Sequence, residues 1–287
     1  MSAWREARGR ESTGALFARP GLGDCRAMVV LRSLIFNIVY YANLIILMIL
    51  GLPTILLGRH AVFALARLWA ASSLWLLKTI CGLRLEFRGL ENIPQGGYII
   101  AAKHQSVLET FSLVLHAPDF AYVLKQELIY VPFFGWYLIG AEQIAINRSA
   151  GRSALSVVSA RAGKVLKAGR QVFIFPEGTR RPPGAPPNYK YGVAKLYEDT
   201  RSPCLPVALN TGLFWGRRGF LRRPGVAVIE YLPVIAPGLS RGAFLPRLQS
   251  VIETGCERLC DEALARDPSL APALQRSAEA EPRRAGP

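Results

Sequence analysis

A long uncharged stretch near the N-terminus limits the folds that this sequence can adopt. No charged side chain occurs between Ser33 and Gly58. A helix over these 26 residues would be about 39 Å long, enough to cross a hydrocarbon core of about 30 Å. Asn37, Asn43 and Pro53 interrupt the stretch, and no small-residue cleavage site ends it. It therefore favours a membrane-anchoring helix over a removable secretory signal.

A second apolar stretch, Leu68–Leu77, lies between Arg67 and Lys78. This stretch is too short to cross a bilayer alone. A helical hairpin that dips into one leaflet, or an amphipathic helix at the interface, fits it better. Trp69 and Trp75 suit the headgroup zone. Basic residues flank both stretches, so the sequence leaves open whether the first helix crosses the membrane completely.

The charge of the chain indicates an anionic partner. The formal net charge is +15, which suits nucleic acid, an anionic membrane surface or a phosphorylated substrate. Aromatic residues do not alternate with basic ones, and there is no zinc-finger spacing, so we expect no nucleic-acid partner. Residues 201–250 contain seven arginines and one acidic residue, and this segment would suit a face that binds anionic membrane lipids.

The cysteine pattern indicates a reducing compartment. The chain contains five cysteines, an odd number, without a C-x-x-C pair, so neither a disulfide framework nor a metal site is expected. The expected location is the cell inner membrane, with the domain that follows the apolar helices facing the cytoplasm.

After Cys81 the sequence alternates between short apolar runs and helical segments. The strands that it predicts are Leu83–Phe87, Tyr98–Ala102, Tyr122–Lys125, Gln143–Ile146, Val172–Phe175, Leu205–Leu209 and Val226–Tyr231. The helices that it predicts in this part are Arg152–Ala168, Tyr191–Asp199 and Gly242–Arg266. This alternation predicts an α/β fold, an αβ sandwich with a mixed, largely parallel sheet.

The chain divides into four parts on these patterns. Residues 1–27 are predicted to be a disordered basic extension, and residues 28–80 form membrane-anchoring hydrophobic helices. Residues 81–266 form the α/β domain. Residues 267–287, rich in Pro, Ala, Arg and Glu, are predicted to be a disordered tail.

One histidine lies where an α/β sheet presents its functional groups. His104 directly follows the buried strand Tyr98–Ala102, whereas His60 and His116 lie in apolar helical segments. Glu109 follows five residues later. If His104 precedes a helix and Glu109 lies in its first turn, the carboxylate can accept a hydrogen bond from one ring nitrogen, and the other nitrogen is free to act as a general base.

A structural explanation of Glu109 competes with this one. Ser106 and Glu109 have the spacing of a capping box, in which the serine caps the helix and the glutamate bonds back to the serine amide. Both explanations place Glu109 in the first helical turn, so both stay open.

A second block, Phe175–Arg180, follows another buried strand. Gly178 can adopt a left-handed turn conformation. Backbone amides, Thr179 and Arg180 together could hold a phosphate, because a guanidinium offers a bidentate fork to phosphate oxygens. The alternative is an ordinary strand-to-loop turn with a solvated arginine.

Three further cations have weaker individual support as anion ligands. Arg148 lies at the end of the strand Gln143–Ile146, where a lone arginine is usually a surface charge. Lys125 and Lys190 are possible anion contacts.

Taken together and in order, these blocks resemble those of the glycerolipid acyltransferase family, in particular its 1-acylglycerol-3-phosphate acyltransferases. The blocks are His104 with Glu109, Ile146-Asn147-Arg148, Phe175–Arg180 and Leu205-Pro206-Val207, and the resemblance covers roughly residues 83–235. It implies that His104 and Glu109 are catalytic and that Arg148, Glu177, Gly178, Thr179 and Arg180 bind the substrate phosphate. Glu177 could hold the acceptor or position Arg180. The family usually has aspartate at the position of Glu109; the extra methylene keeps the charge and moves it by about one bond.

The resemblance implies a reaction. A fatty acyl group would pass from acyl-CoA or acyl-carrier protein to the sn-2 hydroxyl of lysophosphatidic acid, giving phosphatidic acid without a bound cofactor or metal. Alternative acceptors are glycerol-3-phosphate or another lysolipid. The alternative from a different class of function is a non-catalytic basic protein that binds the membrane surface; such a protein would not require the His104–Glu109 pair.

Overall fold

The computed structural model describes residues 22–147 and 151–274 of the chain. Within these residues, seven strands form one sheet in the order β1-β7-β6-β2-β5-β3-β4. Neighbouring strands are parallel, except that β6 and β7 are antiparallel. The prediction of an α/β fold with a mixed, largely parallel sheet is confirmed.

The bounds of the strands and of the long helices of the sheet domain lie within two residues of those predicted. The strands are β1 (Leu83–Arg88), β2 (Ile99–Ala102), β3 (Phe120–Lys125), β4 (Ile144–Ile146), β5 (Gln171–Ile174), β6 (Cys204–Leu209) and β7 (Gly225–Tyr231). The long helices of this domain are α6 (Gly151–Lys167), α7 (Gly192–Thr200) and α9 (Arg241–Arg266). The short helix α4 (Leu108–Ser112) is the one expected to carry Glu109, whereas the sequence patterns missed α5 (Phe134–Gly140) and α8 (Thr211–Phe214), because so few residues display little periodicity.

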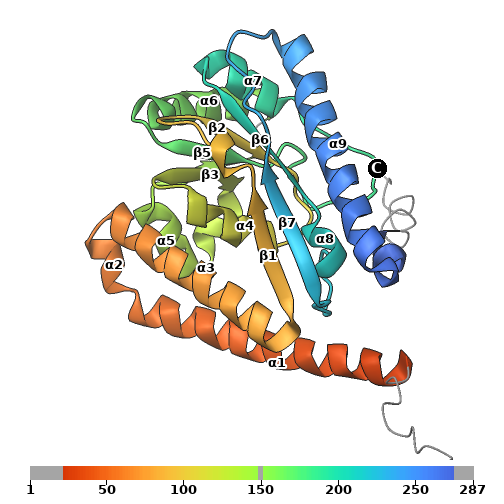
Figure 1. Ribbon diagram of the computed structural model, residues 1–287. Helices are drawn as coiled ribbons and strands as arrows, with labels where there is room; N and C mark the ends of the chain where they lie inside the picture. Colours follow the sequence, from red (N-terminus) through yellow and green to blue (C-terminus); the bar gives the residue numbers. More distant parts are fainter. Residues whose placement is uncertain (1–21, 148–150, 275–287) are drawn as a thin grey trace, which may run out of the picture.

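Helices cover both faces of the sheet. In Figure 1, α6, α7 and α9 lie on one side, while α1 (Leu22–Leu50), α2 (Pro53–Leu56) and α3 (Arg59–Cys81) lie on the other. Side chains of β2 alternate between the two cores: Ile100 and Ala102 pack in the α3 core, whereas Ile99 and Ala101 pack in the core of α6, α7 and α9.

The parallel strands end at one edge of the sheet. Because β2 lies between β5 and β6, the segments that follow these three strands meet there. This arrangement brings together residues 103–107, the loop that begins at Phe175, and the segment that begins at Asn210.

The N-terminal apolar segment forms a hairpin of two helices, α1 and α3, which pack against each other. Asn37 and Asn43 do not interrupt α1, because the Asn37 amide donates to the Ser33 carbonyl and the Asn43 amide donates to Ser72 on α3. The chain turns after Leu50, and Pro53 begins α2. Proline suits that first helical position, where no amide hydrogen is needed.

The second apolar stretch, Leu68–Leu77, is part of a longer helix. It belongs to α3, whose 23 residues include basic positions at the N-terminal end. These basic side chains have protein partners: Arg59 pairs with Asp119 at 3.1 Å, and Arg67 donates to the carbonyls of Ala117 and Pro118. Both α1 and α3 are long and apolar enough to cross a membrane.

One buried arginine fastens α1 to the sheet domain. Arg222 is 4% exposed, donates to Asn37 Oδ1 at 2.6 Å and lies 4.0 Å from the centre of the Trp215 ring. Arg222 therefore does not belong to the basic lipid-binding face that the arginine count of residues 201–250 predicted.

Parts of the two segments that were predicted to be disordered are helical. Leu22–Ala27 belong to α1, and residues 268–274 are helical, with Leu270 buried against the core. Leu270 and Leu274 pack on the core and hold this segment in place, although its composition is polar. Residues 1–21 and 275–287 lie outside the described ranges, so the prediction is not tested there.

Candidate active site

His104 and Glu109 form a close pair at the edge of the sheet. His104 leaves the end of β2, and Glu109 lies in the first turn of α4, so the two side chains meet across the connecting loop. The His104 Nδ1 atom is 2.9 Å from Glu109 Oε1. The carboxylate is fully buried, whereas the imidazole is 16% exposed. The predicted contact is present; the sequence alone left open whether it forms.

The buried carboxylate of Glu109 accepts four hydrogen bonds. Its Oε1 atom also accepts from the amides of Gln105 and Ser106, at 2.8 and 2.6 Å, and its Oε2 atom accepts from the Thr211 hydroxyl at 2.7 Å. Because a carboxylate only accepts, the ring nitrogen that faces Glu109 carries a hydrogen. In the neutral ring, the lone pair then lies on Nε2, the nitrogen that a general base needs.

The predicted capping box is half formed. Glu109 bonds back to the Ser106 amide, but the Ser106 hydroxyl accepts from the amide of Leu108 at 3.2 Å instead of from that of Glu109. The helix begins later than predicted, at Leu108, with Val107 at the N-cap position. Glu109 therefore supports the start of the helix and holds His104 at the same time.

Aromatic rings support the other face of His104. Phe175, which follows β5, stacks on the imidazole with ring centres 3.9 Å apart. Tyr122 stacks behind Phe175 at 6.1 Å and donates its hydroxyl to the Thr110 carbonyl. Burial raises the pKa of Tyr122 well above its ordinary value, so this hydroxyl keeps its hydrogen. Glu109 and these rings together restrict the orientation of His104.

The block Phe175–Arg180 turns sharply beside His104. Gly178 has φ of 67°, as predicted, and its amide donates to the Phe175 carbonyl. That amide is therefore engaged in the turn. Thr179 is exposed and Arg180 is half-buried. Within residues 22–147 and 151–274, the backbone amides of Thr179 and Arg180 make no hydrogen bond, and the Arg180 guanidinium makes no hydrogen bond or ion pair. Both amides and the guanidinium are available to an anion.

The prediction that Glu177 binds the substrate phosphate is wrong for its side chain. The carboxylate is 1% exposed and pairs with Lys103 at 3.0 Å. Burial raises the pKa of Glu177 above its ordinary value, although Lys103 opposes this shift. Strand alternation explains the position, because Lys103 and His104 point to opposite faces of the sheet and Glu177 lies on the side of Lys103.

The remaining predicted cations lie apart from the His104–Glu109 pair or cannot be placed. Lys125 is exposed at the end of β3, and Lys190 is exposed and bonds Asn188 at 2.9 Å. No contact joins either lysine to His104 or Arg180 in the described ranges. Arg148 lies outside the described residues.

Sequence reasoning missed Thr211, Gln105 and Arg181. Gln105 accepts from the Gly212 amide at 3.0 Å, which joins the His104 loop to α8. The Arg181 amide donates to the His104 carbonyl at 2.8 Å. The position of Thr211 directly after the buried strand β6 was a usable signal, because β6 ends beside β2.

The sequence is similar to that of known acyltransferases. Residues 84–210 match the family model described as Acyltransferase. The chain is 37% identical over 214 residues to 1-acyl-sn-glycerol-3-phosphate acyltransferase of Pseudomonas aeruginosa, covering 75% of this chain and 80% of that protein. It is 30% identical over 216 residues to the chloroplastic 1-acyl-sn-glycerol-3-phosphate acyltransferase LPAT1 of Arabidopsis thaliana, covering 71% of this chain and 59% of that longer protein.

A solved structure has the same fold. The crystal structure of the 1-acyl-sn-glycerophosphate acyltransferase PlsC from Thermotoga maritima matches with a TM-score of 0.68 at 22% identity, covering 82% of this chain and 97% of that one. At this identity, the likeness concerns the fold.

The role of Glu109 can be separated from helix capping. In Glu109→Gln, the amide oxygen can keep the donors of Oε1 while the new NH₂ group faces the Thr211 hydroxyl, which can accept. We therefore expect a small change in Tm but a fall in kcat of about 10²-fold or more, because the charge that stabilises the imidazolium is lost. Glu109→Asp should fall between wild type and Gln. Measuring kcat and Tm on all three proteins tests this, and a stable, fully active Glu109→Gln would show that the carboxylate only caps the helix.

Proposed function

The chain belongs to the glycerolipid acyltransferase family, and from this premise we propose that it is a 1-acylglycerol-3-phosphate acyltransferase. It transfers a fatty acyl group from an acyl thioester to the sn-2 hydroxyl of lysophosphatidic acid, giving phosphatidic acid for phospholipid synthesis. The relatives described above carry this activity in their names.

A single juxtaposition in the structure supports the proposal best. Glu109 holds Nδ1 of the partly exposed His104 ring. The turn that contacts His104 through Phe175 also carries Arg180, which has no partner among the described residues. An acceptor that has a hydroxyl close to a phosphate can place one group on each. A protein that only adheres to lipid needs no such pair.

The chemistry follows from the state of the imidazole. His104 Nε2 removes the proton from the sn-2 hydroxyl as that oxygen attacks the thioester carbonyl carbon. A carbon–oxygen bond forms, the carbon–sulfur bond breaks, and the imidazolium returns the proton to the leaving thiolate. Glu109 stabilises the imidazolium during the transfer without accepting its proton.

The donor is acyl-CoA or acyl-carrier protein, and we propose that it binds as a substrate. The steps above use only His104, Glu109 and groups that hold the phosphate, so they require neither a resident cofactor nor a metal ion. After the transfer, the donor leaves the site as its free thiol. For the acceptor, Arg180 and the amides of Thr179 and Arg180 would hold the phosphate.

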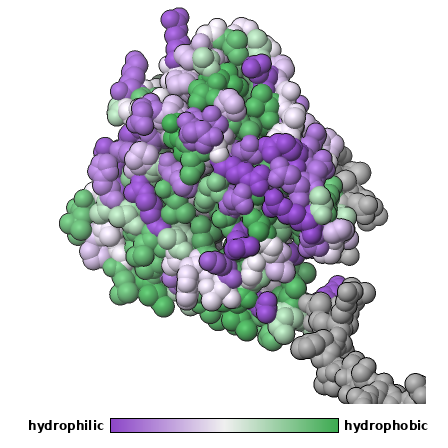
Figure 2. All heavy atoms as spheres, in the orientation of Figure 1, coloured by the Kyte–Doolittle hydropathy of each residue, from purple (hydrophilic) through white to green (hydrophobic). Residues whose placement is uncertain are grey.

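The N-terminal hairpin supports a proposal for the membrane position. The outer side of α1 exposes apolar side chains, among them Leu34, Ile38 and Ile45, and Figure 2 shows hydrophobic surface along the lower edge, where this hairpin lies in Figure 1. On its inner side, α3 packs against the sheet domain along its length, from Phe63 on Phe120 to Cys81 in the core beside β1. A full crossing would therefore carry polar parts of this domain into the bilayer.

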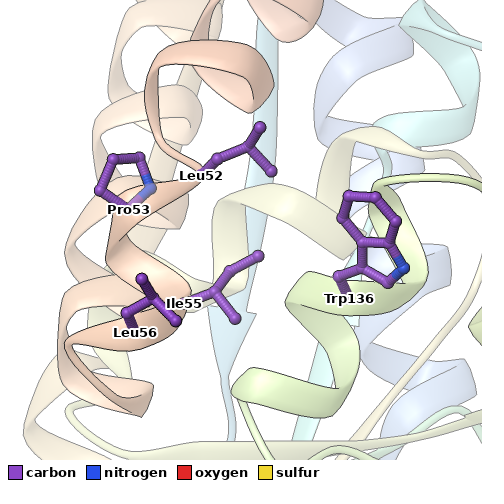
Figure 3. Close-up of a pocket in the computed structure, with 5 residues that line it drawn as sticks. All are labelled: Leu52, Pro53, Ile55, Leu56 and Trp136. Atoms are coloured by element: carbon purple, nitrogen blue, oxygen red, sulfur yellow. The ribbon is translucent and has the colours of Figure 1, made fainter.

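Helix α5 extends this apolar surface. Trp136 of α5 faces Leu52, Ile55 and the other residues of the α2 turn across an apolar groove of about 430 Å³ (Figure 3), and the exposed Ile139 lies one turn along the helix. We propose that the hairpin and α5 lie in one leaflet of the inner membrane, with the sheet domain in the cytoplasm.

The reaction itself gives the first test. Purified protein in mixed micelles should transfer a radiolabelled acyl group from acyl-CoA or acyl-carrier protein to lysophosphatidic acid, and His104→Ala should lower kcat about 10²–10⁴-fold. Glycerol-3-phosphate and lysophosphatidylcholine serve as competing acceptors. Preference for either of these acceptors would replace the proposed substrate, and His104→Ala activity within a few-fold of wild type would remove His104 from the mechanism.

A second test concerns the acceptor phosphate. Arg180→Ala should raise the acceptor KM about 10- to 100-fold, since it removes a charge-assisted hydrogen bond of roughly 1.5–3 kcal/mol. Arg201→Ala, at the exposed end of α7, is the matched control and should leave KM unchanged. If Arg180→Ala raises only the donor KM, this arginine serves the thioester instead.

The membrane orientation can be measured with an environment-sensitive fluorophore. It is attached in separate variants to Leu34→Cys on α1, Ile139→Cys on α5 and Val157→Cys on α6, all exposed positions; wild type reports labelling of the native cysteines. With vesicles of phosphatidylcholine and phosphatidylglycerol, we expect a blue shift at positions 34 and 139 and none at 157, on the opposite layer. A shift at 34 alone would exclude α5 from the membrane face.

A further inference from the structure

A buried row of charges lies behind the candidate active site. Lys103 precedes His104 and points to the opposite face of the sheet, where its side chain is 3% exposed. Its ammonium group donates to Glu177 Oε1 at 3.0 Å and to both carboxylate oxygens of Glu253 on α9, at 2.8 and 3.0 Å. Lys103 therefore contacts two glutamates that lie 74 and 150 residues further along the chain.

The row continues from Glu177 to a second cation. Arg181 Nε lies 3.5 Å from Glu177 Oε1, and the Arg181 side chain is 13% exposed. Its Nη2 atom donates to the Pro186 carbonyl at 2.8 Å, and its backbone amide donates to the His104 carbonyl at 2.8 Å. We call Arg181, Glu177, Lys103 and Glu253 the buried charge chain. It starts and ends with groups of opposite sign, and it includes a direct hydrogen bond to the residue proposed as general base.

The same carboxylates hold the far end of the loop. The Asn188 amide donates to Glu177 Oε1 at 3.3 Å, and the Tyr189 hydroxyl donates to Glu253 Oε1 at 2.8 Å. The Lys190 amide closes the loop on the Pro176 carbonyl at 2.8 Å. Residues 176–190, which contain Arg180, are therefore fastened at both ends.

The balance of charge explains how this chain can stay buried. Two cations alternate with two carboxylates, so no net charge is left inside the protein. Burial alone would lower the pKa of Lys103, but Glu177 and Glu253 outweigh it and raise the pKa above its ordinary value. Buried ion pairs add little stability compared with apolar packing, because desolvation opposes the attraction. Buried ion pairs do restrict the positions of the segments that carry them, because each buried charge requires its partner nearby.

We propose that the buried charge chain positions the loop 176–190 against His104, and that Lys103 and Glu253 are therefore positioning residues for the acceptor phosphate. Through Glu177 and Arg181 they place the neighbouring Arg180 beside the base without touching substrate. The two neighbouring arginines therefore have different roles: Arg181 is held by the protein, and Arg180 is left to bind the ligand. The part that concerns acceptor binding rests on the proposed function.

The kinetic test uses Glu253→Gln, with Glu257→Gln as the matched control one turn further along α9, where the side chain is exposed. Neutralising Glu253 removes one of the two charges that hold Lys103. We expect the acceptor KM to rise roughly 3- to 30-fold while kcat and the donor KM stay within about 3-fold, because distributed coupling of this kind has such magnitudes and the His104–Glu109 pair is untouched. A lower Tm with unchanged acceptor KM, or equal changes in both KM values, would overturn the proposal.

A second measurement does not depend on turnover. Hydrogen exchange of the Arg181 and Lys190 amides, read on the full chain in micelles, should be faster in Glu253→Gln than in Glu257→Gln. Equal exchange in the two variants would refute the positioning role, even if the acyl-transfer assay fails for wild type. Failure of that assay alone would count against the proposed function and leave the exchange comparison valid.

A variant without buried lone charges guards against misfolding. Lys103→Met combined with Glu253→Gln removes one charge of each sign and leaves Arg181 beside Glu177, so no lone charge remains in the chain. This protein should fold and show the same rise in acceptor KM and the same faster exchange. A folded double variant with wild-type acceptor KM would contradict the proposal.

Discussion

The geometry of the candidate active site, at the edge of the sheet, depends on one buried carboxylate. Glu109 receives four donors, from the ring of His104, the amides of Gln105 and Ser106, and the hydroxyl of Thr211. These donors come from the loop after β2 and from the start of α8 after β6, so the carboxylate joins two neighbouring strand ends. A buried charge that lost these donors would be costly, and the loop is therefore held in one conformation with His104 Nε2 facing outward.

Strand alternation divides the remaining work between the two faces of the sheet. His104 turns towards α4 and the Phe175 ring, while Lys103 turns towards α9. Two consecutive residues thus have different roles. His104 presents the base, and Lys103 fastens the loop that carries Arg180. This arrangement pairs Lys103 and Glu109 in the interior. It leaves Arg180 without a partner among the described residues, so that a ligand can pair with it.

The N-terminal hairpin has two roles that its composition does not separate. Its inner side completes the core on the α4 face of the sheet, and its outer side exposes apolar residues that suit a lipid environment. Arg59, Arg67 and Arg222, which a count of charges would assign to the membrane surface, instead bind the hairpin to the sheet domain. The layer that carries Glu109 and the proposed membrane face are consequently the same layer.

Local patterns in the sequence determined the strands, the long helices of the sheet domain, the position of His104 at a strand end and the turn at Gly178. Each of these depends on residues close together in the chain, where periodicity and turn chemistry act. The sequence could propose the contact between His104 and Glu109, because five residues separate them, but not decide it. Only the tertiary structure decided that Thr211 completes this pair and that Glu177 turns inward to Lys103. It also decided that Arg181 is held while Arg180 has no partner in the described part of the chain. Those outcomes depend on partners up to 102 residues away, and no local pattern records which side chains a folded sheet brings together.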